Sequence, residues 1–221
     1  MKSRAILTII LIAMVITITG CSNGGPSKTE TPTQENEVVN AVASEAPATE
    51  TPMTQESVIA EEPVATSEAL SDYLRWRDVI FSVTSDQVDV VTDQPNQVYG
   101  VIMDVGLSDD FIISITAFPT GESSLRTTVG GGAIGLGNDE TIAAQAESIV
   151  VLAQSLTEEA YQINNQTLPK SQKVYFYFLT TSGLMLSETT LEEVSAQDHP
   201  FHEMFGRFTE IKRRSEELTN P

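Results

Sequence analysis

Cysteine, histidine and tryptophan are scarce in this sequence of 221 residues, which has one Cys, two His and one Trp. One cysteine excludes a framework of internal disulfides and a four-cysteine zinc site, and two histidines exclude a three-histidine metal centre. Cations are also few, because 12 Lys and Arg stand against 31 Asp and Glu, for a net charge of −19. Nucleic-acid binding needs clustered cations, so we predict no nucleic-acid partner.

The N-terminus has the pattern of an export signal. Lys2 and Arg4 precede an uncharged, mostly apolar run over residues 5–19. This run is shorter than the roughly 20 helical residues that span a bilayer, so residues 1–20 are predicted to be a signal peptide.

The end of that signal, Ile18-Thr19-Gly20-Cys21, resembles the lipobox of bacterial lipoproteins. The resemblance implies cleavage before Cys21, acyl chains on this residue, and an extracytoplasmic protein anchored to the cell membrane or outer membrane. The alternative is an uncleaved anchor helix in which the cysteine is incidental. Either interpretation places the remaining chain outside the cytoplasmic membrane.

Residues 21–67 are predicted to form a disordered, acidic stalk. They contain eight Glu and one Lys, are rich in Thr and Pro, and have no aromatic residue. Such a composition buries too little apolar surface to offset the entropy of ordering the chain. All 14 aromatic residues lie at Tyr73 or beyond, so residues 68–221 are predicted to form one globular domain, with a net charge of −14.

Apolar periodicity predicts an α+β domain with the order α-β-β-β-α-β-β-α. The first helix is capped by Ser67 and turns Leu70, Tyr73, Leu74, Ile80 and Phe81 inward, and the last follows a capping Asp198 and turns Phe201, Met204, Phe205, Phe208 and Ile211 inward. We expect about five strands in a mainly antiparallel sheet with flanking helices. The remaining elements are strands at 98–105, 111–118, 123–129, 173–181 and 184–189 and a helix at 139–161.

A glycine-rich loop at 130–138 formally satisfies G-x-G-x-x-G. A dinucleotide site needs this motif inside a βαβ unit, whereas here the preceding strand belongs to a predicted meander, and Asp139 and Glu140 bring negative charge to the start of the next helix. Close approach of backbone to backbone explains the glycines more simply. The alternative is a ligand site formed by Gly130, Gly131, Gly132, Gly135 and Gly137 with Asp104 and Arg126.

Catalytic motifs are missing from the sequence. It contains no S-x-x-K, and H-E-x-x-H fails at His202 because Gly206 stands where the second histidine would be. We therefore predict no catalytic residues, no metal site and no cofactor, which favours a binding module over an enzyme.

Residues 98–214 resemble an uncharacterised bacterial domain family. The matching stretches are VYGVIMDVG (98–106), SSL (123–125) followed by GGGAIGLG (130–137), KVYFYFLTTSG (173–183) and HPFHEMF (199–205). The resemblance implies a shared fold without a known activity. We therefore expect a lipid-anchored binding or interaction module with a protein or cell-envelope partner, and the alternative is a nucleotide-binding or small-ligand protein, or an enzyme, with its site at residues 130–138.

Overall fold

The computed structural model describes residues 65–91 and 94–219. The predicted signal peptide, Cys21 and nearly all of the predicted stalk lie outside these residues and stay predictions. No helix in the described part of the chain is long and apolar enough to cross a membrane.

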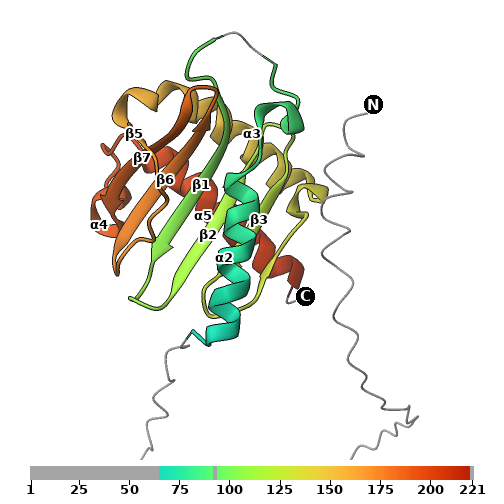
Figure 1. The fold of residues 1–221 in the computed structure, drawn as a ribbon, viewed down its shortest axis with the longest axis vertical. Helices are drawn as coiled ribbons and strands as arrows, with labels where there is room; N and C mark the ends of the chain where they lie inside the picture. The colour runs from blue at the N-terminus through green and yellow to red at the C-terminus, as the bar shows by residue number, and fades with distance from the viewer. Residues whose placement is uncertain (1–64, 92–93, 220–221) are drawn as a thin grey trace, which may run out of the picture. The chain divides into compact units, whose positions relative to one another are not determined.

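The described chain has an α+β fold built on one antiparallel sheet of seven strands, in the order β4-β3-β2-β1-β6-β7-β5 (Figure 1). The α+β class and the antiparallel sheet are as predicted, but the expected number of about five strands is wrong. The strands are β1 (Val98–Gly106), β2 (Ile112–Ala117), β3 (Ser123–Thr127), β4 (Gly132–Ala133), β5 (Tyr161–Ile163), β6 (Lys173–Thr180) and β7 (Gly183–Thr190).

Helices lie on both faces of this sheet. In Figure 1, α2 crosses the face toward the viewer, and α3 and α5 lie behind the sheet. The helices are α2 (Ser67–Phe81), α3 (Glu140–Ser155), α4 (Leu191–Ser195) and α5 (His202–Thr219), with short 3-10 turns η1 (Ser85–Val88), η2 (Leu136–Asn138) and η3 (Thr157–Glu159).

Strand alternation divides the side chains of β1 between the two faces. Val101, Met103 and Val105 join the main core with α3 and α5. Because successive side chains of a strand point to opposite faces, Ile102 and Asp104 point to the α2 face. That face therefore combines apolar residues with a buried carboxylate, whereas the opposite face is a continuous apolar core.

The helix predicted at 139–161 is too long. α3 ends at Ser155, the chain turns through η3, and Tyr161 begins β5, which pairs with β7. The other unpredicted strand, β4, is formed by two residues of the glycine-rich loop that pair with Leu125 and Arg126 of β3.

The inward face of α2 also differs from the prediction. Its N-cap is Thr66, whose hydroxyl accepts a hydrogen bond from the Ala69 amide, and Ser67 is the first helical residue. Leu74 is 41% exposed, whereas Arg77 is 3% exposed. A charged residue thus takes one of the most buried positions of this helix.

α5 begins four residues after Asp198, so this residue is not its N-cap. The predicted apolar side of α5 is confirmed, because Met204, Phe208 and Ile211 are buried and Phe205 packs against the core. Phe201 is also buried, just before the helix begins, and stacks on Phe176 of β6.

Candidate functional site

Polar side chains form a row across the sheet beneath α2. Strand register pairs Asp104 of β1 with Ser114 of β2, and Ser114 with Arg126 of β3. Two of the residues predicted from the sequence, Asp104 and Arg126, therefore lie on the same face, separated by one strand. Their surroundings are very different.

Asp104 is fully buried in an ion pair with Arg77 of α2. The Nη1 atom of Arg77 lies 2.5 Å from Asp104 Oδ2, and the side chains of these residues are 4% and 0% exposed. Ser114 Oγ donates to Asp104 Oδ1 at 2.5 Å. Since this hydroxyl has only one proton, the 2.6 Å bond between Ser114 and the Tyr73 hydroxyl is donated by Tyr73. The result is a chain of hydrogen bonds from Tyr73 through Ser114 to Asp104.

Further contacts hold the Arg77 guanidinium in place. Its Nη2 donates to the Thr167 carbonyl at 3.3 Å, and its Cζ lies 4.6 Å from the centroid of Phe81 and 5.2 Å from that of Tyr177. The Tyr177 hydroxyl donates to the same Thr167 carbonyl. Helix α2, the sheet and the loop between β5 and β6 therefore meet at one guanidinium.

Burial raises the pKa of the Asp104 carboxyl, although the Arg77 charge and the Ser114 hydroxyl oppose that shift. Burial also raises the pKa of the Tyr73 hydroxyl, and that of Tyr177 to about 12, and the negative charge of Asp104 adds to both shifts. Both tyrosines are therefore protonated hydrogen-bond donors at neutral pH. Because solvent does not reach Asp104, we interpret this cluster as a clamp that fixes α2 to the sheet, not as an acid-base site.

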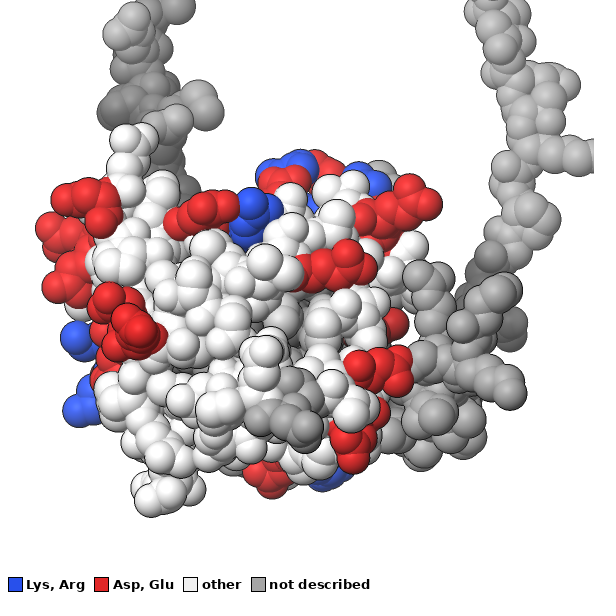
Figure 2. Space-filling model, turned by 90° about the horizontal axis from the view of Figure 1, so that it is seen from above, with Lys and Arg blue, Asp and Glu red and all other residues white. Residues whose placement is uncertain are grey.

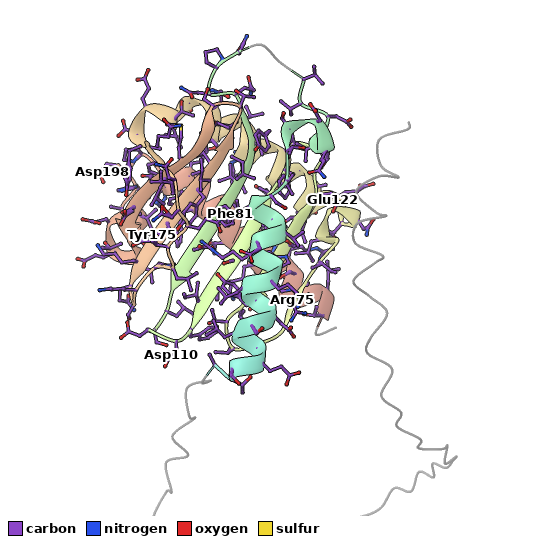
Figure 3. All side chains as sticks on the ribbon, in the orientation of Figure 1. Arg75, Phe81, Asp110, Glu122, Tyr175 and Asp198 are labelled. Carbon is purple, nitrogen blue, oxygen red and sulfur yellow. The ribbon has the colours of Figure 1, made fainter. Side chains whose placement is uncertain are left out.

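Next to the clamp, a cavity of about 160 Å³ lies between α2 and strands β2 and β3. Its walls are mainly apolar, and its mouth reaches the surface, because the lining residues Ser82 and Gln87 are exposed and Val79 is 40% exposed. In Figure 3, Phe81 and Arg75 mark α2 where it crosses the strands, and Glu122 lies toward the β3 edge. The lining residues are Trp76, Val79, Ile80, Ser82, Val83, Gln87, Thr116, Phe118, Glu122, Ser123, Ser124, Arg126, Ile134 and Gly135.

The hydroxyl groups in this cavity are satisfied by one another and by the backbone. Thr116 Oγ1 lies 2.9 Å from Ser124 Oγ and accepts from the Ser124 amide at 2.9 Å, and Ser123 Oγ donates to the Thr116 carbonyl at 2.7 Å. The half-buried Arg126 differs from them. Its Nε is the only buried side-chain nitrogen or oxygen in the described chain without a hydrogen-bond partner.

The candidate site predicted from the sequence is only partly assembled. Arg126 and Gly135 line the same cavity, and Ile134 of the same loop joins them. Asp104 and the other candidate glycines, Gly130, Gly131, Gly132 and Gly137, are not among the lining residues.

At two of the glycines that do not line the cavity, another part of the backbone comes too close to leave room for a side chain. Gly132 has φ +123°, and a Cβ there would lie 2.2 Å from the Leu125 carbonyl oxygen. A Cβ on Gly137 would lie 2.7 Å from the Gly121 carbonyl oxygen. These contacts support the interpretation of the loop as a tight connection between β3 and α3.

The N-terminus of α3 is already occupied by a carboxylate of the protein. Asp139 Oδ1 accepts from the amides of Thr141 and Ile142, both at 3.1 Å, and its Oδ2 accepts from Arg214 Nη2 at 2.8 Å. The Arg214 hydrogen bond, followed by the bond from the Ile142 amide, lowers the pKa of Asp139. A ligand phosphate at this helix end would have to displace Asp139, which argues against a nucleotide in the loop.

The histidines have structural contacts. His199 Nδ1 accepts from the Phe201 amide, so its Nε2 carries the proton and donates to Thr189 Oγ1 at 3.2 Å. A histidine in this tautomer cannot take the Thr189 proton, so the pair is not an activated nucleophile. No group of three or more His, Cys, Asp or Glu within residues 65–91 and 94–219 is arranged to hold a metal ion.

Comparisons with family models, with curated proteins and with solved structures find no match to this chain. The resemblance of residues 98–214 to an uncharacterised bacterial domain family therefore stays a prediction.

Sequence reasoning missed Arg77, which belongs to the clamp, and Trp76, which lines the cavity. One signal could have found Arg77: Asp104 is the only charged residue in the apolar strand VYGVIMDVG, and a buried carboxylate requires a cation. Arg77 is a cation within the first predicted helix, where it would have been a candidate partner. No comparable signal marks Trp76 as a cavity wall.

Proposed function

We propose that this chain is a lipoprotein, anchored through Cys21 to the cell membrane or outer membrane, whose globular domain is a binding module. The module holds an apolar group of a partner or ligand in the cavity between α2 and the sheet. The observation that carries this proposal is the cavity, with its apolar walls and open mouth.

The size of the cavity favours a small group. Pockets for drug-sized ligands have volumes of about 300 to 1,000 Å³, whereas this cavity has about 160 Å³. An engineered apolar cavity of about 150 Å³ in another protein binds benzene. One aromatic or aliphatic side chain, or a small molecule with one ring, therefore fits the space, and a nucleotide does not.

Labelling cells with an alkyne-bearing palmitate tests the anchor. We expect the wild-type chain to incorporate the label and to fractionate with membranes, and Cys21→Ala to lose the label. A label that survives in Cys21→Ala would contradict the lipoprotein assignment. Cys21→Ser provides a second, more conservative variant with the same expected loss.

Titration with 2-phenylacetamide, a neutral one-ring probe, tests the cavity. Trp76 is the only Trp of the chain and lines the cavity, so its emission reports binding in protein reconstituted into lipid vesicles. For a ligand this small we expect a saturable change with a Kd on the order of 1 mM. Empty vesicles give the background signal.

A pair of matched variants locates the binding. Val79→Phe places a ring at the mouth of the cavity, and we expect it to weaken binding about 10-fold or more, which is about 1.4 kcal/mol. Val151→Phe makes the same substitution at a residue of α3 that is 76% exposed and does not line the cavity, and should leave binding unchanged. Equal affinity in both variants would refute binding in this cavity.

A further inference from the structure

We propose that Arg126 makes the cavity selective for an apolar group that carries a carboxylate. The inference rests on the proposed function, since it names the chemical class of ligand for the same cavity. Two sources supply this chemistry: a small carboxylic acid with one ring, and the C-terminus of a peptide whose last side chain is apolar.

The first argument is the hydrogen-bond inventory of the cavity. Thr116, Ser123 and Ser124 have partners within the protein, so they offer little to a ligand. The Arg126 side chain makes no hydrogen bond or ion pair within the described chain, and its Nε is shielded from water. A buried donor without a partner is costly, and the described chain supplies no acceptor for this guanidinium.

The second argument is the distribution of charge. The domain, residues 68–221, has 23 carboxylate residues and nine cations, yet Arg126 has no carboxylate partner among the residues that the structure describes. Each of the other described arginines forms an ion pair with Asp or Glu; they are Arg75, Arg77, Arg207, Arg213 and Arg214. Arg126 is therefore an arginine on the wall of a cavity, without a carboxylate partner in the described part of an acidic domain. We infer that its partner is the anionic group of a bound ligand.

The cavity favours a monoanion over a phosphate. Arg126 is the only cation among its described lining residues, and Glu122 also lies on the wall. Arg126 lies four positions after Glu122, which places their Cα atoms about 13 Å apart in extended backbone. Figure 2 shows acidic side chains at several places around one end of the domain, with few basic ones. A dianion would be repelled by this field, whereas a carboxylate matches the planar fork of one guanidinium.

The test compares each acid with its neutral amide on the vesicle-reconstituted chain, with Trp76 emission as the readout. Phenylacetate and 2-phenylacetamide represent the small molecule, and Gly-Gly-Phe with a free or amidated C-terminus represents the peptide. We expect the acid of at least one pair to bind about 10-fold to 100-fold more tightly than its amide, as is typical of a charge-assisted hydrogen bond. The pair with the tighter acid identifies the source.

Arg126→Gln should reduce this preference to less than about 3-fold while the amide still binds. Because the Arg126 side chain makes no hydrogen bond in the described chain and the backbone pairing of β3 is unchanged by the substitution, the variant should fold, and a thermal unfolding curve checks this. Arg75→Gln is the matched control: it removes the same charge from the outer side of α2, where the Arg75 side chain is 65% exposed, and should keep the preference.

The outcomes separate the two proposals. Equal binding of acids and amides to the wild-type chain, or a preference that survives in Arg126→Gln, would overturn the inference about Arg126 and leave the binding module intact. Binding of none of the four probes would overturn the proposed function itself.

Discussion

Replacing Arg77 by Met would leave the Asp104 carboxylate buried without its cation. The Asp104 side chain is 0% exposed and the Arg77 side chain 4% exposed, so water cannot substitute for the lost partner. Removing one member of such a pair costs about 3 to 5 kcal/mol, a large part of the roughly 5 to 15 kcal/mol that stabilises a typical domain. Methionine keeps an apolar stem beside Phe81 and Tyr177, so the loss is mainly electrostatic.

Urea unfolding followed by circular dichroism measures this effect. With a slope of about 2 kcal/mol per molar urea, the midpoint of Arg77→Met should fall by roughly 1.5 to 2.5 M. The control is Arg75→Met, whose partner Asp72 is 64% exposed; exposed pairs contribute about 0 to 1 kcal/mol, so the midpoint should shift little. Similar shifts in the two variants would refute the interpretation of Arg77 and Asp104 as a clamp.

The pH dependence of the same variant gives a second readout. Because burial raises the folded-state pKa of Asp104, folding favours its protonated form, and this contribution is present below the ordinary pKa and lost as pH rises through the folded value. Arg77→Met removes the charge that opposes the shift and so raises the folded pKa further. The stability difference between wild type and variant should therefore narrow as pH falls from about 7 toward about 4. A constant difference would contradict the assignment of the effect to the Asp104 charge.

Three further predictions concern the loop and the helices around it. Gly132→Ala should destabilise the domain by about 1 to 3 kcal/mol, because its φ of +123° and the 2.2 Å approach to the Leu125 carbonyl leave no room for a methyl group. Gly206→Ala should stabilise the domain by about 0.5 to 1 kcal/mol. This glycine is inside α5, and no described atom beyond the neighbouring backbone of its own helix lies within 4 Å of the position that a Cβ would take. The urea midpoints of the two glycine variants check these predictions, and shifts of the opposite sign would contradict them. Arg214 and the α3 amides lower the pKa of Asp139, so the contribution of its carboxylate to stability is present above the ordinary pKa and lost as pH falls through the folded-state pKa. The melting temperature of Asp139→Asn should therefore be below that of wild type at about pH 7 and close to it at about pH 2. An equal difference in melting temperature at both pH values would contradict the assigned ion pair.

Local sequence patterns were sufficient for the long elements. The apolar run VYFYFL of β6 and the strand VYGVIMDVG of β1 were located almost to the residue, since a continuous apolar run is typical of a strand covered on both faces. The apolar side of α5 was also predictable, because its buried residues recur at helical spacing.

The two extra strands depend on pairing between distant segments. Tyr161–Ile163 is only three residues long and follows α3 without a Gly or Pro signal, and it becomes a strand because β7 offers a free edge. Its pairing partner Leu186 is 25 positions further along the chain from Tyr161, so no local pattern contains this information.

The candidate site was predictable only in part, for a related reason. Arg126 and the loop residue Gly135 were chosen from the sequence, and both line the cavity. The other half of the cavity comes from α2, whose inward side is set by the burial of Arg77 against Asp104 and not by apolar periodicity. The pattern of hydrophobic residues predicted that Leu74 points inward, whereas Leu74 is exposed. The same pattern gives no reason to expect a charged residue such as Arg77 to be buried.

A structure of the chain determined with phenylacetate bound would test the central claim most directly. We predict that the ring lies between α2 and the sheet, near Trp76 and Phe118, and that the carboxylate contacts the guanidinium of Arg126. Phenylacetate at another place on the domain, or a ring in the cavity with its carboxylate directed away from Arg126, would contradict the account.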